Sequence, residues 1–193
     1  MSSRFTRRQL FRLGPVDVVR GIVARRGAGG EARESRPIRP PGALEEGRFL
    51  ETCLRCGECA EACPHDAILP LGPSAGRAEG TPFLIPDETA CHWCPEMDCV
   101  DACKSGALRL GEGEVPAPIA KAVIDLDACL VSQGILCDTC VHYCPTSIKA
   151  ISMVKRSPVV DGDACVGCGL CSHYCSAPES AVRIVPLTIP ENP

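Results

Sequence analysis

The residues with the clearest chemical potential are sixteen cysteines, which fall into four groups of four with none left over. Thiolates grouped without histidine or carboxylate companions favour iron–sulfur clusters or zinc over harder metal ions. The four quartets are Cys53, Cys56, Cys59, Cys63; Cys91, Cys94, Cys99, Cys103; Cys129, Cys137, Cys140, Cys144; and Cys165, Cys168, Cys171, Cys175.

The spacing within the quartets indicates cubane iron–sulfur clusters. The first quartet and Pro64 follow the C-x2-C-x2-C-x3-C-P run, in which three cysteines bind one cluster and the fourth binds its neighbour. The last quartet has the same spacing, the second has two extra residues between its middle cysteines, and the third has a seven-residue gap after its first. We therefore predict four [4Fe–4S] clusters, with all sixteen cysteines as iron ligands and each fourth cysteine in the short helix that follows its loop.

Three other uses of the cysteines compete with this prediction. A disulfide framework does not require a repeated spacing, and zinc sites usually pair C-x2-C knuckles about 12–20 residues apart. One or two purely structural clusters also stay open. The four histidines lie close to cysteines but are not expected to be ligands, because no cysteine is missing; they are His65, His92, His142 and His173.

Composition shows that something other than bulky side chains must stabilise the fold. The 193 residues include only four Phe, two Tyr and one Trp, whereas metal binding can supply folding free energy directly. Residues 1–40 hold ten Arg and three acidic residues, a net charge of +7, and residues 41–193 hold ten basic and 21 acidic residues, a net charge of −11. No apolar run approaches the roughly 18 residues of a membrane span.

Short apolar segments flank the quartets and predict strands of small antiparallel hairpins. These segments are residues 67–71, 83–88, 107–110, 122–127, 150–154, 158–163 and 181–185. The predicted fold class is α+β, with two ferredoxin-like modules of two clusters each.

The predicted domains are a basic, extended or poorly ordered segment (1–47), a module with the first two quartets (48–115) and a module with the last two (116–193). A nested arrangement, which pairs the first quartet with the fourth and the second with the third, stays open.

Four stretches together resemble the NapG/MauM group of ferredoxin-type proteins, and also the shorter NapF proteins. They are RPPGALEEGRFLETCLRCGECAEACP, CHWCPEMDCVDACKSGAL, CLVSQGILCDTC and CVGCGLC. The resemblance covers about residues 36–187 and includes the irregular second and third spacings. Lys104 and Ser176 depart from the pattern, since they replace the proline after the second and fourth quartets.

The resemblance implies an electron-transfer subunit that relays electrons through four [4Fe–4S] clusters. Its partners would be a membrane quinol-oxidising subunit, a molybdenum-type oxidoreductase, or both. An assembly or maturation factor of the NapF kind is the alternative function. The chain is not expected to be an enzyme, because no dinucleotide fingerprint or nucleophile–base pair is visible, and its acidic body argues against nucleic acid.

Residues 6–11, TRRQLF, resemble a twin-arginine export motif, although charged residues interrupt the segment that follows. We therefore expect a cytoplasmic protein at the inner face of the membrane, held there by a partner or by its basic N-terminal segment. Periplasmic location by twin-arginine export is the alternative.

Overall fold

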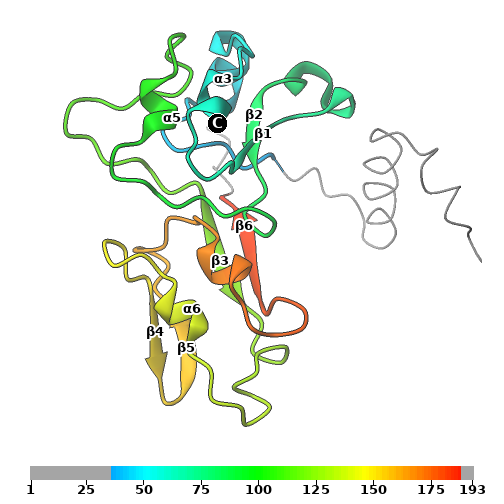
Figure 1. Cartoon of the computed structure of the whole chain (residues 1–193), viewed down its shortest axis with the longest axis vertical. Helices are drawn as coiled ribbons and strands as arrows, with labels where there is room; N and C mark the ends of the chain where they lie inside the picture. Colours follow the sequence, from blue (N-terminus) through cyan, green and yellow to red (C-terminus); the bar gives the residue numbers. More distant parts are fainter. Residues whose placement is uncertain (1–35, 188–193) are drawn as a thin grey trace, which may run out of the picture. The chain divides into compact units, whose positions relative to one another are not determined.

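The computed structural model describes residues 36–187, in which short helices alternate with three separate two-stranded antiparallel sheets (Figure 1). This mixture confirms the α+β class. The twin-arginine motif and most of the basic segment lie outside the described residues. Among the described helices, none is both long and apolar enough to cross a membrane.

The helices are short, and four of them are single turns that each carry one cysteine. They are α3 (Glu46–Thr52), α4 (Glu58–Glu61), the 3-10 helix η1 (Pro73–Ala78), α5 (Asp98–Asp101), α6 (Thr139–His142) and α7 (Leu170–His173). The strands are β1 (Ile68–Pro70), β2 (Pro82–Leu84), β3 (Ala120–Ile124), β4 (Ile151–Val154), β5 (Ser157–Val160) and β6 (Val182–Pro186).

The strand pairs are arranged around the first two quartets and around the last two. β1 pairs with β2 between the first and second quartets, and β4 pairs with β5 between the third and fourth. β3, which precedes the third quartet, pairs with β6, which follows the fourth, from Ala120 opposite Pro186 to Ile124 opposite Val182. The corresponding position around the first two quartets has one isolated bridge, Ala43 with Leu108.

Six of the seven predicted strand segments overlap an observed strand, and residues 107–110 are the exception. The bridge from Leu108 is the only strand pairing in that segment. Its partner segment begins with Pro40 and Pro41, which have no N–H groups to extend a ladder.

Residues 36–45 differ from the extended connector that the sequence predicts. The Leu84 N–H donates to the Ile38 carbonyl at 2.8 Å, and the Leu44 N–H donates to the Ala107 carbonyl at 3.0 Å. Pro40 and Pro41 are fully buried. The packed structure therefore includes residue 38, nine residues before the expected boundary at residue 47.

Arg39, which is buried, fixes this segment to the rest of the fold through an ion pair with the partly buried Glu46. Its guanidinium contacts the Glu46 carboxylate at 2.6 and 2.9 Å and donates to the Thr81 hydroxyl and the Pro82 carbonyl at 2.8 and 2.7 Å. It also lies 4.7 Å from the centre of the Phe49 ring, which is fully buried.

Arg39→Ala is expected to destabilise the fold by about 3 kcal/mol, because it removes a buried guanidinium with four hydrogen bonds and leaves the partly buried Glu46 carboxylate without its partner. The measurement is the denaturation midpoint of the cluster-loaded protein, followed anaerobically by far-UV circular dichroism. Lys104→Ala is the control: its pair with Glu58 is exposed, and exposed pairs contribute little. Equal effects of the two substitutions would contradict the role given to Arg39.

Candidate metal centres

Four cavities occur in the described structure that are each lined by four cysteines, three from one quartet and one from another. We name each site after the quartet that supplies three cysteines. The first site is lined by Cys53, Cys56, Cys59 and Cys103. The second is lined by Cys91, Cys94, Cys99 and Cys63. The third is lined by Cys129, Cys137, Cys140 and Cys175. The fourth is lined by Cys165, Cys168, Cys171 and Cys144.

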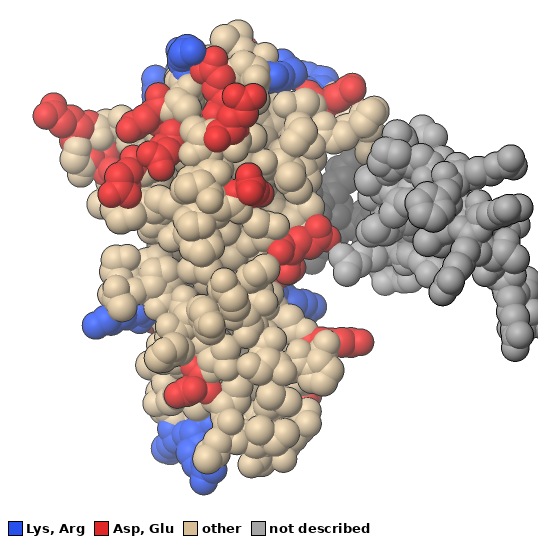
Figure 2. All heavy atoms as spheres, in the orientation of Figure 1, with Lys and Arg blue, Asp and Glu red and all other residues tan. Residues whose placement is uncertain are grey.

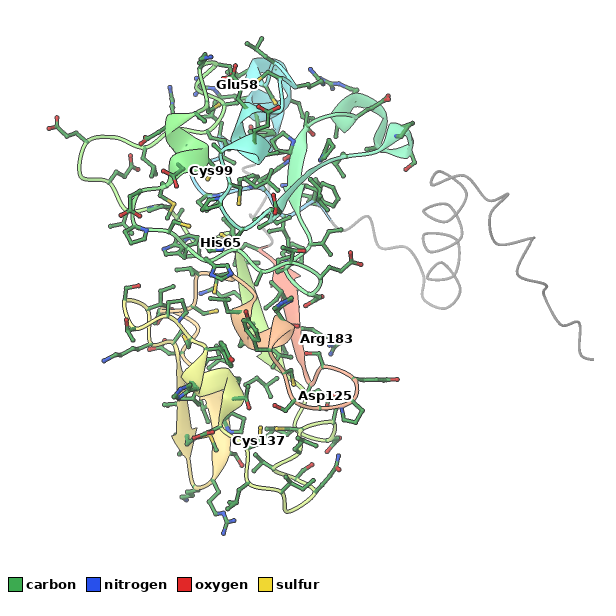
Figure 3. The ribbon with its side chains drawn as sticks, viewed as in Figure 1. Glu58, His65, Cys99, Asp125, Cys137 and Arg183 are labelled. Atoms are coloured by element: carbon green, nitrogen blue, oxygen red, sulfur yellow. The ribbon has the colours of Figure 1, made fainter. Side chains whose placement is uncertain are left out.

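The exchange of fourth cysteines is reciprocal. The first two quartets exchange Cys63 and Cys103, and the last two exchange Cys144 and Cys175. Helix α4 packs against α5, and α6 packs against α7, which brings the exchanged cysteines to their sites. Figure 3 shows Cys99 in the part built around the first two quartets and Cys137 in the part built around the last two.

The helices hold the third cysteine of each quartet rather than the fourth. Helix α4 contains Cys59 and is capped by Ala62, so that Cys63 lies just beyond the helix. The same order holds in α5, α6 and α7. The sequence prediction placed the fourth cysteine inside the helix and was wrong by two residues, because each helix ends after four residues.

The turn before the third cysteine needs an unusual backbone conformation in three quartets. Gly57 and Gly169 cap α4 and α7 with φ of 82° and 89°, in the left-handed region that glycine adopts easily. In the irregular second quartet Met97 takes this place with φ of 49°, whereas Asp138 in the third has φ of −137°. The second and third quartets have extra residues between their cysteines, and the turn before the third cysteine differs accordingly. The third cysteine of each nevertheless lines its site.

Burial raises the pKa of many of these thiols. The pKa of Cys59 and Cys140 rises to about 11, and that of Cys91, Cys99 and Cys171 to about 12, chiefly because burial disfavours the thiolate. Neighbouring thiols add to this effect: Cys63 acts on Cys99, and Cys168 acts on Cys91. Without iron these thiols stay protonated at neutral pH, so metal binding must release protons.

Backbone N–H groups point at several of the sulfurs. The Leu108 N–H donates to the Cys103 Sγ at 3.3 Å, and the Ala150 N–H donates to the Cys144 Sγ at 3.2 Å. Although burial raises the pKa of Cys103, hydrogen bonds from Leu108, Ser105 and nearby backbone lower it overall. Such bonds also set the reduction potential of a bound cluster. Sequence reasoning missed these donors, because any residue except proline can supply a backbone N–H.

The donor set fits an iron–sulfur cluster. Each site offers four thiols in a mainly apolar cavity, and all sixteen cysteines are free of disulfides. Over residues 36–187, no three His, Cys, Asp or Glu side chains converge on a single metal ion. His65 and His92 border the second site and stack at 3.5 Å between ring centres; His142 and His173 line none of the four cavities.

The two residues that replace the usual proline after a fourth cysteine, Lys104 and Ser176, each contact a side chain of a neighbouring helix. Lys104, after Cys103, donates to the Glu58 carboxylate at 3.0 Å, and the hydroxyl of Ser176, after Cys175, lies 3.0 Å from that of Thr139. Both contacts join the exchanged cysteine to the helix that carries the third cysteine of the same site. The departures from the family pattern thus add a contact at the first and third sites.

Three segments match known iron–sulfur families. Residues 49–69 match the family described as "4Fe-4S binding domain". Residues 90–148 and residues 121–181 each match a family described as "4Fe-4S dicluster domain". The two dicluster matches overlap, since one spans the second and third quartets and the other spans the third and fourth.

Whole-chain relatives agree with these matches. The chain is 36% identical over 165 residues to the ferredoxin-type protein NapG of Escherichia coli (strain K12), covering 79% of this chain and 71% of that protein. It is 38% identical over 167 residues to the methylamine utilization ferredoxin-type protein MauM of Paracoccus denitrificans (strain Pd 1222), covering 79% and 73%. It is also 31% identical over 159 residues to the ferredoxin-type protein NapF of E. coli (strain K12), covering 78% and 85%.

No solved structure matches the chain. The irregular spacings, the cysteine-lined cavities and the relatives at 36–38% identity lead to one conclusion: the chain belongs to the NapG/MauM family of ferredoxin-type proteins, and it carries electrons on [4Fe–4S] clusters.

Proposed function

We propose that the chain is a relay of four [4Fe–4S] clusters, one held at each of the four sites by the four cysteines that line it. The observation that carries this proposal is the lining of the cavities, which uses each of the sixteen cysteines once. When bound, the clusters supply one-electron carriers. The chain's own groups hold the iron, exclude water by burial, and adjust the potential through N–H groups such as those of Leu108 and Ala150.

We further propose two modules, residues 36–115 and residues 116–187, with two sites in each. The reciprocal exchange of cysteines supports this arrangement, as does the pairing of β3 with β6 around the last two quartets. The nested arrangement would place Cys63 in a site with cysteines of the fourth quartet. The lining of one cavity by Cys63 together with Cys91, Cys94 and Cys99 supports the sequential arrangement.

The two proposed modules differ in charge, which bears on their partners. Residues 36–115 hold seven basic and fourteen acidic residues, a net charge of −7, whereas residues 116–187 hold five basic and six acidic residues, a net charge of −1. Figure 2 shows the acidic side chains gathered over the part that contains α3 and α5. Charge complementarity then favours a partner with a basic surface on the first module.

As a subunit of a redox complex, the chain would link a quinol-oxidising membrane protein to a molybdenum-type or other terminal oxidoreductase, on the cytoplasmic face of the membrane. Periplasmic location is the alternative, and it depends on the twin-arginine motif. A second candidate function is the maturation of a partner metalloenzyme, which is what the resemblance to the NapF proteins implies; the chain is 31% identical to one of them. A stable complex with the mature partner would favour the relay, and binding only to the metal-free partner would favour maturation.

The relay is tested by iron and acid-labile sulfide per chain after anaerobic purification, together with EPR of the dithionite-reduced protein. We expect about sixteen of each, since four cysteine sites hold four irons each, with magnetically interacting S = 1/2 signals. Clearly fewer irons, or zinc in their place, would overturn the four-cluster relay.

A further inference from the structure

The two halves of the described chain meet where the second quartet contacts the fourth. The Cys91 N–H donates a hydrogen bond to the Cys168 carbonyl at 2.8 Å. Cys91 lines the second site and Cys168 lines the fourth. One peptide hydrogen bond thus joins a ligand-bearing residue of one half directly to a ligand-bearing residue of the other.

Buried packing holds this contact in place. Ala90, Cys168 and Leu170 form a small buried cluster, and the partly buried Trp93 and Val166 pack against it. The hydroxyl of the buried Ser172 lies within hydrogen-bond distance of two acceptors, the exposed Asp87 carboxylate at 2.6 Å and the Val182 carbonyl at 2.7 Å. The segment that leads into the second quartet is therefore bound on both sides of Cys91 to the loop and helix of the fourth.

At this junction Gly169 lies so close to Pro86 that there is no room for a larger residue at position 169. A Cβ atom at Gly169 would lie 2.3 Å from the Pro86 Cβ and 2.9 Å from the Pro86 carbonyl oxygen. At the equivalent position of the first quartet, Gly57 has nearly the same backbone conformation, but a Cβ there would meet nothing within 4 Å. The left-handed turn explains both glycines, and the contact with Pro86 is specific to Gly169.

We propose that electrons cross between the two halves from the second site to the fourth, through the hydrogen-bonded peptides of Cys91 and Cys168. The order of the relay is then first, second, fourth, third, which differs from the order along the chain. Each crossing oxidises one site by one electron and reduces the next by one, so that no other reactant is consumed. The inference rests on the proposed function, since it needs both sites to hold clusters.

This order leaves the first and third sites at the two ends of the relay, where partner proteins would exchange electrons. Each of these sites has an exposed apolar side chain beside its cysteines. Leu54 is 71% exposed next to Cys53, and Leu136 is 81% exposed next to Cys137. In contrast, Cys165, Cys168 and Cys171 of the fourth site are all buried.

The order is tested by pulsed EPR of the reduced full-length protein in a Cys56→Ala background, which lacks the first site. The second site's signal is identified by its loss in Cys94→Ala. We expect this signal to be split by a neighbouring spin, to lose the splitting when Cys171→Ala removes the fourth site, and to keep it when Cys140→Ala removes the third. Loss of the splitting in Cys140→Ala, but not in Cys171→Ala, would overturn the proposed order.

A second measurement leaves all sixteen cysteines in place. Gly169→Ala is expected to weaken the spin coupling between the second and fourth sites and to slow electron crossing in flash-reduction kinetics, because the new methyl group pushes Pro86 away. Gly57→Ala, the matched control, carries the same backbone strain without the collision, and should leave this coupling unchanged. Equal effects of the two variants, or no effect of Gly169→Ala, would overturn the proposal that electrons cross at this junction.

The iron content of each sample distinguishes a failure of the proposed order from a failure of the four-cluster relay itself. A wild-type protein with about sixteen irons but without second-to-fourth coupling overturns the order and leaves the four-cluster relay intact. A wild-type protein with clearly fewer irons overturns the relay itself.

Discussion

Replacing Cys103 by alanine is expected to abolish the same EPR signal as replacing Cys56, although the two residues belong to different quartets. Both line the first site, so that either substitution removes a ligand of one cluster. Iron content should fall from about sixteen to about twelve per chain in each variant, since one four-iron cluster is lost. The measurement is a comparison of reduced EPR spectra, which needs no prior assignment of any signal to a site.

The complementary pair is Cys63→Ala and Cys99→Ala, which should both abolish the signal of the second site. If each quartet instead held its own cluster, Cys103→Ala would match Cys99→Ala, and Cys63→Ala would match Cys56→Ala. That grouping would contradict the exchange of cysteines, even if the protein still bound about sixteen irons.

Removing the iron is expected to abolish cooperative folding. Phe49 is the largest side chain that is fully buried in the described structure, and more than half of the other buried hydrophobic residues there are alanine or cysteine. Iron–thiolate bonds must therefore supply much of the folding free energy, as metal binding does in small zinc domains, where one structural zinc contributes on the order of 10 kcal/mol. The measurement is far-UV circular dichroism and thermal unfolding after anaerobic chelation of the iron.

Arg39→Ala provides the control for this experiment. In the loaded protein it should lower the denaturation midpoint, whereas in the chelated protein it should have little effect, because the pocket around Glu46 and Thr81 is no longer formed. A cooperative thermal transition that persists without iron, and that still responds to Arg39→Ala, would show that the fold does not depend on its clusters.

The strand segments were predictable because they depend on local patterns. Residues 150–154 and 158–163 are short apolar segments separated by three residues, and the structure places β4 and β5 there. The pairing of β3 with β6 could not be predicted in the same way. Their registered residues are about sixty positions apart, and both the sequential and the nested arrangements contain the same short segments.

The segment from Arg39 to Gly42 could not be predicted either. Arg-Pro-Pro-Gly is typical of a connector when only neighbouring residues are considered. Its burial depends on Leu84, Thr81 and Leu108, which lie about forty or more residues further along. The sixteen cysteines were identified from their spacing alone, but their division among four cavities required the packing of helix against helix.

The exchange of cysteines also has a consequence for how the protein is made. Under the proposed ligand sets, the second site spans Cys63 to Cys99 and lies within the first, which spans Cys53 to Cys103; the fourth likewise lies within the third. A chain emerging from the ribosome would therefore complete each inner site a few residues before the outer site around it. A cluster delivered at the first loop before Cys103 has been synthesised would have three cysteine ligands, so correct loading depends on delivery being timed to the second quartet of each pair.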